Sequence, residues 1–267
     1  MKQNLRHTLL MLLFALPILP ARGEVEPLME DPFGIIGVAP TVAGGQTFSL
    51  GLGYSRARDG ANRDLYGGAL EAEAGLVRGL DLRLAQTAEY GPAAPYPLDD
   101  AKRVWGGLSQ LGLRWQVLEE DGWRPAFGVF GALRSAYGET SGPSLSGQIA
   151  GLLSKIIIEG THPLALSVNA GWSELFNAVP GERAGRYEFA AGLTQNLAQD
   201  TSFGVSYLRN QQDRGEKDRN IIAAGLWQRL GPAGPIMAAG AGVGIGEDSP
   251  RFLLFASFKW LFGAARP

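Results

Sequence analysis

Eleven charged residues, Asp81 among them, fall on the polar face of alternating segments, and ten of the eleven are the strongest candidates for chemistry in this sequence. These ten are Glu71, Glu73, Arg83, Glu89, Arg114, Arg134, Arg186, Glu188, Arg251 and Lys259. If these residues line one enclosed space, facing acidic and basic arcs would produce a transverse field that selects polar solutes. Alternatively, the carboxylates and the cations pair across that space and close it. The sequence leaves both alternatives open.

The sequence offers little for acid–base or nucleophilic catalysis. Its 267 residues include no cysteine and only two histidines, which excludes disulfides, thiolate metal sites and cysteine nucleophiles together. Beyond the N-terminal leader only His162 remains, beside Pro163 in a short turn, where a solvated side chain is expected rather than a general base. No histidine cluster could hold a transition metal. We therefore predict no enzyme activity, no catalytic residue, no cofactor and no metal site.

Two acidic clusters and one glycine repeat have simple structural interpretations. Asp99-Asp100 and Glu119-Glu120-Asp121 could bind calcium weakly, but solvated turn charges are the commoner explanation. The repeat from Gly240 to Gly246 lacks both the GxGxxG-to-helix context and the GK[ST] ending of nucleotide loops. Glycines in a strand instead leave a smooth wall that another segment approaches closely.

The first 23 residues have the layout of a secretory signal peptide. Lys2, Arg6 and His7 precede a short apolar run over 8–19, and Ala21-Arg22-Gly23 supplies small residues for cleavage. A transmembrane helix needs about 20 apolar residues, more than this run contains. Its removal leaves 21 of the 24 basic residues against 26 acidic ones, a net charge near −5. That balance argues against a nucleic-acid partner, which would require clustered positive charge.

The remaining chain alternates apolar with small or polar residues, and this period of two predicts β-strands. Residues 164–172, for example, place leucine, valine and tryptophan on one face and serine, asparagine and glycine on the other. The 38 glycines, about twice the usual share, disfavour a helical fold. Twelve strands are predicted, over 47–56, 68–78, 80–90, 104–117, 123–135, 143–157, 163–174, 184–196, 201–210, 218–229, 234–246 and 250–263. The sixth, tenth and eleventh alternate poorly, and Ile221-Ile222-Ala223-Ala224 fits either register.

Short turns alternate with longer polar loops between these segments, which predicts an all-β, antiparallel, up-and-down transmembrane barrel. An even strand count places both termini at the short-turn, periplasmic end. Aromatic residues gather at both rims, as expected of membrane interfaces. The long-loop rim would carry Tyr54, Tyr66, Tyr90, Tyr137, Tyr187, Tyr207, Trp105 and Trp172, and the short-turn rim Trp115, Trp123, Trp227, Trp260 and Phe262. A soluble sandwich or lipocalin-like barrel would also alternate, but its outer face would carry more lysine and glutamate.

The stretch from Gly68 to Phe262 resembles the outer-membrane barrels grouped under the MetA pathway of phenol degradation, a family labelled "transporter". The resemblance rests on the Val77–Leu82 hairpin, on 107–127 with its acidic turn and Pro-Ala strand opening, and on 152–155 followed by 166–172. It implies an outer-membrane barrel. By its label alone it implies transport of aromatic or other hydrophobic molecules, and it supplies no catalytic residues.

These observations predict four regions: a signal peptide over 1–23, a proline-interrupted segment over 24–46, a barrel over 47–263 and a tail over 264–267. The 24–46 segment is either a plug that enters the lumen or a periplasmic tail. The expected role is passage of small solutes across the outer membrane of a Gram-negative bacterium. A structural or loop-presenting barrel is the alternative, and a lipid-modifying enzyme ranks third. Expected partners are outer-membrane lipid, a small-molecule solute and, through the aromatic last strand, the barrel-assembly machinery.

Overall fold

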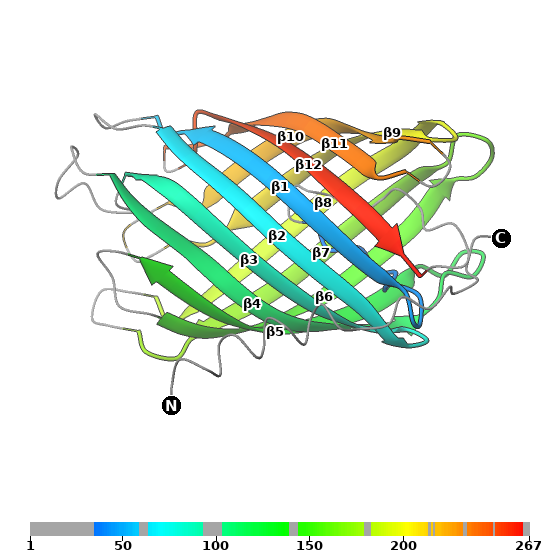
Figure 1. Cartoon of the computed structure of the whole chain (residues 1–267), viewed down its shortest axis with the longest axis horizontal. Helices are drawn as coiled ribbons and strands as arrows, with labels where there is room; N and C mark the ends of the chain where they lie inside the picture. The colour runs from blue at the N-terminus through cyan, green and yellow to red at the C-terminus, as the bar shows by residue number, and fades with distance from the viewer. Residues whose placement is uncertain are drawn as a thin grey trace.

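The chain forms a closed barrel of twelve antiparallel strands, each hydrogen-bonded to its sequence neighbours (Figure 1). The computed structural model describes residues 35–58, 64–92, 103–138, 144–178, 183–212, 215, 217–231, 234–247 and 249–263. The strands are β1 (Gln46–Arg56), β2 (Asp64–Val77), β3 (Leu80–Pro92), β4 (Arg103–Leu118), β5 (Ala126–Gly138), β6 (Ser144–Ile158), β7 (Leu164–Leu175), β8 (Gly185–Ala198), β9 (Thr201–Asn210), β10 (Arg219–Arg229), β11 (Ile236–Gly244) and β12 (Phe252–Phe262). The predicted fold class and strand number are confirmed. In these ranges no helix has the length and apolar character needed to cross a membrane.

The seam between the first and last strands closes the barrel. β1 pairs antiparallel with β12 along its full length, from Gln46 opposite Phe262 to Arg56 opposite Phe252. Figure 1 shows β1 in blue beside β12 in red. No strand of the barrel is left with an unpaired edge, the feature that otherwise invites association with other chains. Because the strand number is even, β1 starts and β12 ends at the same end, here called the short-turn end; the opposite end is the long-loop end.

Most strand boundaries lie within two residues of the sequence prediction, and the largest differences are at the start of β2 and at both ends of β5. β2 begins at Asp64 rather than at 68, because the ladder with β1 continues to the pair Arg56 and Asp64. β5 begins at Ala126 rather than at 123, because Asp121 and Arg124 form a bridged turn with backbone hydrogen bonds of 2.9 and 3.2 Å. The connection over 119–125 is therefore as long as some connections at the other end.

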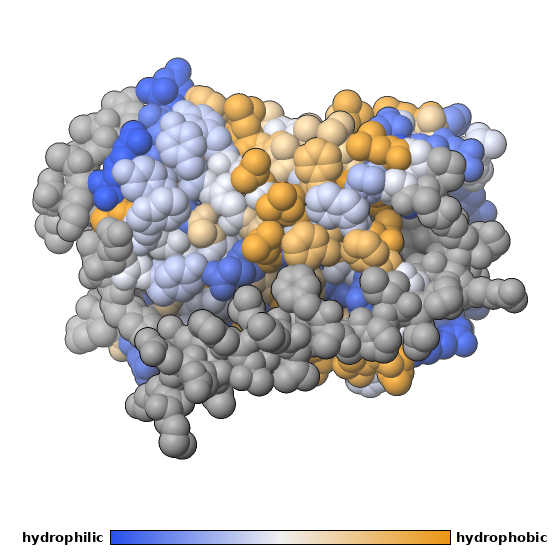
Figure 2. All heavy atoms as spheres, in the orientation of Figure 1, coloured by the Kyte–Doolittle hydropathy of each residue, from blue (hydrophilic) through white to orange (hydrophobic). Residues whose placement is uncertain are grey.

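The barrel is apolar outside and polar or charged over much of its inside. Outward leucines and isoleucines such as Leu52, Leu133 and Ile149 are more than half exposed. Figure 2 shows an apolar band across the middle of the visible face, with hydrophilic residues toward both ends. Inward residues of β2, β3 and β4 include the buried Glu73, Asp81 and Arg114. This arrangement inverts the usual distribution of a soluble protein.

Aromatic contacts on neighbouring strands lie near both ends of the barrel. The rings of Tyr54 and Tyr66 lie 5.3 Å apart, and those of Tyr90 and Trp105 lie 5.0 Å apart. Near the short-turn end, the ring of Phe48 lies 5.9 Å from that of Trp260. These pairs match the predicted positions of the two rims.

Trp227 does not lie on the lipid-facing rim at the short-turn end, where the sequence predicts it. It faces the lumen and is only 3% exposed, in a cluster with Ile221, Ala223, Ile236 and Ala238. In the 221–224 run, whose register the sequence leaves open, Ile221 and Ala223 face inward. Because side chains alternate between the two faces of a strand, Trp227 also faces inward. A rim tryptophan would instead face lipid.

Inward rings lie against inward glycines of the adjacent strand. A β-carbon on Gly204 would come within 2.7 Å of the Trp227 indole, and one on Gly112 within 2.6 Å of the Phe130 ring. A β-carbon on Gly240 would collide with the ring of Phe255. The glycines therefore let these rings lie close to the wall. For Gly240 this agrees with the predicted close approach of another segment to the glycine repeat.

Candidate functional site in the lumen

A buried ion-pair cluster lies inside the barrel on β2, β3 and β4. The guanidinium of Arg114 donates to Asp81 at 2.5 Å and to Glu73 at 3.4 Å. The side chains of Arg114 and Asp81 are fully buried, and that of Glu73 is 3% exposed. Strand pairing explains their meeting, because Asp81 lies directly opposite Arg114 in the β3–β4 ladder. Buried charges are tolerated only when paired in this way.

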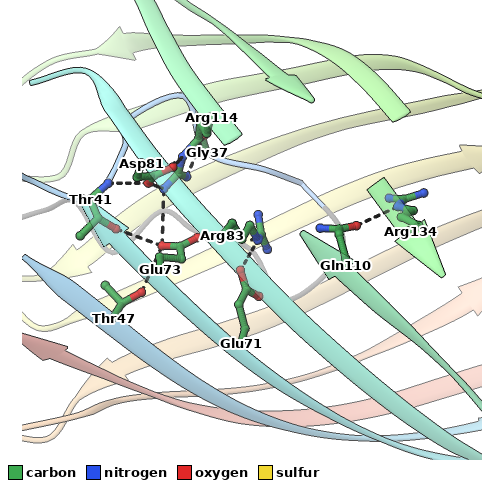
Figure 3. Close-up of polar contacts among 10 residues, drawn as sticks. All are labelled: Gly37, Thr41, Thr47, Glu71, Glu73, Asp81, Arg83, Gln110, Arg114 and Arg134. Carbon is green, nitrogen blue, oxygen red and sulfur yellow. Dashed lines mark hydrogen bonds and ion pairs between the residues drawn. The ribbon is translucent and has the colours of Figure 1, made fainter. Parts of the chain in front are cut away.

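The same cluster holds the segment that precedes β1, over 35–45. The backbone N–H of Thr41 donates to Asp81 at 2.8 Å, and the Thr41 hydroxyl donates to Glu73 at 3.2 Å. Arg114 also donates to the carbonyl oxygen of Gly37 at 3.1 Å. Figure 3 shows these contacts converging from the segment and from the barrel wall. Within the predicted 24–46 region, the described residues before β1 thus contact the inner side of the wall, and Gln46 already belongs to β1. Residues 24–34, the 1–23 leader and the 264–267 tail lie outside the described residues.

Backbone contacts hold the segment against β2. Gly44 N–H donates to the Gly75 carbonyl at 2.9 Å, and Gly75 N–H donates to the Gly45 carbonyl at 3.0 Å. Any β-carbon at Gly75 would collide with the carbonyl oxygen of Val42, so this close approach requires glycine. Val38 is buried in an apolar cluster that includes Phe130 of β5. The segment is therefore packed as well as hydrogen-bonded.

A second group of charges lies next to the buried cluster. Arg83 pairs with Glu71 and lies 3.7 Å from Glu73 (Figure 3). Its guanidinium also lies 5.9 Å from the centre of the Phe130 ring. Bases are thus interleaved with acids on β2, β3 and β4 rather than gathered in facing arcs. These ion pairs join strands that lie side by side in the wall, so they form neither facing arcs nor pairs that cross the lumen.

A polar chain links strands that are not neighbours. Arg134 of β5 donates to Glu188 of β8 at 3.1 Å and to Gln110 of β4 at 2.7 Å. Gln148 of β6 donates to the other oxygen of Glu188 at 2.6 Å. Since β5 and β8 are separated by two strands, these side chains extend inside the barrel. They form a polar chain that is separate from the buried cluster.

The remaining four predicted residues occupy different surroundings. Glu89 and Lys259 line the cavity described below. Arg186 is half-buried on β8, two residues before Glu188. Arg251 is exposed, lies just before β12 and donates its backbone N–H to the Arg56 carbonyl. It therefore belongs to the connection between β11 and β12 rather than to the strand in which it was predicted.

A cavity of about 400 Å³ occupies the lumen between the 35–45 segment and the wall. Charged residues line part of it: Glu71, Glu73, Arg83, Glu89 and Lys259. Apolar residues line another part: Ile35, Ile36, Trp227, Ile236, Ala238 and Phe255. Small residues of β1 and β12, including Ser49, Gly51 and Ser257, form the rest of the lining. The cavity lining is therefore charged on β2 and β3 and largely apolar on β10, β11 and β12, where Lys259 lies opposite Ile236.

The other candidate residues show ordinary structural contacts. His162 is exposed in the β6–β7 turn, with Nδ1 3.2 Å from the Asn196 carbonyl oxygen. In the acidic cluster, Glu119 pairs with Arg78 and Glu120 pairs with Lys155. Asp99-Asp100 lies outside the described residues. Among the residues that are described, no group of three histidine, cysteine or acidic side chains could hold a metal ion.

The sequence places Asp81 on the polar face but does not mark it as a site residue, and it does not predict the apolar part of the cavity lining. Because Asp81 lies on the same polar face as Arg83, the sequence indicates that it points inward. Its role in the site depends on the hydrogen bond from Thr41, which the sequence does not indicate. Inward Trp227 and Phe255 were hidden because large apolar residues were all expected to face lipid. The alternating pattern identifies two faces but not an apolar patch on the inner one.

Comparison with known proteins supports the fold. No protein-family model matches the chain, and no curated protein matches it. The COG4313 outer-membrane channel from Pseudomonas putida F1 is similar with a TM-score of 0.55 and 12% identity, over 87% of this chain and all of that one. The KdgM porin (TM-score 0.47, 9% identity, 79% of this chain and 98% of that one) and the Ralstonia pickettii toluene transporter TbuX (0.45, 10%, 91% and 95%) are more distant. The chain thus shares its barrel fold with an outer-membrane channel.

Proposed function

We propose that the protein is an outer-membrane channel for small molecules. The observation that carries this proposal is a closed barrel with apolar side chains outside and a charged, partly hollow interior. The shortest strand has nine residues, enough to cross the hydrocarbon core when tilted. Aromatic pairs near both ends suit the two interfaces. An N-terminal export signal and assembly through the aromatic β12 belong to the same proposal.

We further propose that the 35–45 segment is a plug at the short-turn, periplasmic end. Its support is the set of contacts with Asp81, Glu73 and Arg114, together with the buried position of Val38. A twelve-stranded barrel falls between barrels filled by side chains and wide porins. A segment inside such a barrel controls how much of the lumen remains free. Aromatic or other hydrophobic solutes remain the substrate class implied by the MetA-type resemblance.

Single-channel conductance in a planar bilayer tests both proposals. The wild-type protein should give discrete, reproducible steps, and deletion of residues 24–42 should enlarge them. The matched control is Arg78→Ala, which removes an exposed ion pair from the same end of the barrel. Unchanged conductance after the deletion would eliminate the plug. A folded barrel that conducts nothing with or without these residues would argue against a channel.

A further inference from the structure

We propose that the lipid-facing surface of the barrel carries a binding site for a phosphorylated glycolipid of the outer leaflet. The site lies at the long-loop end of β1 to β4 and consists of Arg56, Asp64 and Arg103 with a row of aromatic side chains next to them. This inference goes beyond the channel proposal, because it concerns the outside of the barrel and requires no conducting lumen. It shares with that proposal only the orientation in which the long-loop end faces outward.

The three charged residues lie together on the outward face. Arg56 of β1 lies opposite Asp64 of β2, and Arg103 of β4 reaches the same carboxylate from across β3. Alternation places each of them on the same face of its strand as an exposed apolar or aromatic residue, namely Leu52, Tyr66 and Trp105. Within the described strands β12 and β1 to β4, no other outward position carries a charge. The outward charges of these five strands are thus confined to one place at one end.

A row of aromatic residues borders these charges on the side toward the middle of the barrel. Tyr54, Tyr66, Tyr90 and Trp105 lie on four consecutive strands, each directly opposite the next. Figure 2 shows pale ring-shaped side chains between the apolar band and the hydrophilic left end of the visible face, where Figure 1 shows the long-loop ends of these strands. Rings in such a row lie at the level of the lipid headgroups. The charged residues beyond them therefore lie among the headgroups as well.

The charge balance at this place favours an anion. Arg56 Nη1 and Arg103 Nη2 each lie 3.8 Å from a different oxygen of Asp64, too far for a hydrogen bond. Asp64 accepts a hydrogen bond of 2.7 Å from the Tyr54 hydroxyl. Two cations therefore flank one carboxylate without being committed to it, and their side chains are 43% and 33% exposed. Guanidinium groups in this state suit a phosphate, which they bind through paired N–H donors.

Another outward arginine at the same end has the opposite arrangement. Arg209 of β9 shares its face with the exposed Phe203 and Val205, and it donates to Asp218 through two nitrogens, at 2.9 and 2.7 Å. The Tyr187 ring also lies against its guanidinium, with the centre 5.5 Å away. The donors of Arg209 are thus directed at a carboxylate. The uncommitted arginines on β1 and β4 are therefore not a general property of this rim.

A phosphorylated glycolipid matches each part of this surface. Its acyl chains would lie along the apolar band, and its phosphate would lie between the two arginines. Its sugar would pack C–H groups against the faces of Tyr66 and Trp105, which are about half exposed. In a Gram-negative outer membrane the lipid of the outer leaflet is of this kind, because lipid A carries phosphate on its sugars. A free phosphate would contact the arginines alone.

Native mass spectrometry of the mature chain, refolded in detergent, measures lipid binding directly. The probes are lipid A, phosphatidylglycerol (an anionic lipid without a sugar) and inorganic pyrophosphate. The wild-type barrel should bind lipid A with an affinity about tenfold or more above that for phosphatidylglycerol. Pyrophosphate at the same concentration should not displace the bound lipid A.

Substitutions locate the site and test its charge. Arg56→Gln combined with Arg103→Gln should weaken lipid A binding about tenfold or more, and either change alone should have a smaller effect. Arg209→Gln is the matched control at the same rim and should leave the affinity unchanged. Asp64→Asn should bind lipid A at least as tightly as wild type, since it removes the competing anion. The shift between folded and unfolded bands on gels verifies that each variant folds, and the single arginine variants replace the double one if it does not.

The outcomes separate this inference from the channel proposal. Equal losses in the β1–β4 arginine variants and in Arg209→Gln, or weaker binding by Asp64→Asn, would overturn the site. Equal affinity for phosphatidylglycerol would overturn the glycolipid assignment, and displacement by pyrophosphate would show a free-phosphate site instead. None of these measurements depends on current through the lumen. A barrel that binds lipid A selectively but conducts nothing would overturn the channel and leave the glycolipid site in place.

Discussion

The guanidinium of Arg114 and the carboxylate of Asp81 lie 2.5 Å apart, and neither side chain is exposed to solvent. They face one another across the β3–β4 ladder, and both also contact the 35–45 segment, Arg114 at Gly37 and Asp81 at Thr41. One ion pair thus connects the barrel wall to the proposed plug. Removing it should affect both stability and permeation.

Asp81→Asn should destabilise the barrel by about 3 kcal/mol, because it leaves the buried Arg114 without its main counter-charge. The measurement is the midpoint of urea unfolding, followed by the shift between folded and unfolded bands on gels. Glu119→Gln is the control: the exposed pair of Arg78 and Glu119 should contribute less than about 1 kcal/mol. Equal midpoints for the two variants would show that Glu73 alone compensates Arg114.

Gly75→Val should expel the 35–45 segment, since a side chain there collides with the Val42 carbonyl. The chain has no cysteine, so one introduced thiol can be followed without interference. Val38→Cys should resist maleimide labelling in the otherwise unchanged protein and react readily once Gly75→Val is added. Ala39→Cys, at an exposed neighbouring position, should react in both backgrounds. Continued protection of position 38 would contradict the need for glycine at 75.

Arg134→Ala should increase single-channel conductance, because it removes the centre of the polar chain from Gln110 to Glu188. Loss of a cation should also shift selectivity toward cations. Leu133→Ala provides a control of similar size reduction on the adjacent, outward-facing position. A conductance that changes equally in both variants would assign the effect to the barrel's shape rather than to this polar chain.

A cluster at the long-loop end should give an acid-dependent contribution to stability. The hydrogen bond from Tyr187, reinforced by Arg209, lowers the pKa of the Asp218 carboxyl despite partial desolvation. A carboxyl whose folded pKa lies below its unfolded value stabilises the fold above the unfolded pKa. This contribution disappears as pH falls through the folded pKa. Urea unfolding between pH 6 and pH 2 should therefore depend less on pH in Asp218→Asn, and an unchanged profile would contradict the assignment.

Much of the barrel was predictable because its strands obey one strong rule. One face of each strand meets lipid and the other faces the lumen, so a shift of the strand register by one residue would turn every side chain to the wrong face. The alternation in 164–172 therefore predicts both that this segment is a strand and which side chains face inward. The rule gives no prediction where both faces of a strand carry residues of similar hydrophobicity. In 221–224 isoleucine and alanine occupy both faces, and the inward position of Trp227 followed only from the assembled sheet.

Most charged members of the site were predictable, whereas its apolar members and the contacts between its residues were not. Glu73, Arg83 and Arg114 were identified as inward charges from alternation alone. Their pairing depends on strand register, and Arg134 meets Glu188 only because the barrel is closed and narrow enough for side chains to span β5 to β8. The contact between Thr41 and Asp81 joins a segment without periodicity to a strand. No local pattern encodes such a contact.

The pairing of β1 with β12 also constrains how the molecule is made. Residues 46–56 meet residues 252–262, so the final hydrogen-bonded ladder joins the two ends of the barrel sequence. Until β12 has been synthesised and docked, β1 presents unpaired backbone groups that hydrocarbon cannot satisfy. Membrane insertion of a half-made chain is therefore unfavourable, and assembly approaches an all-or-none event.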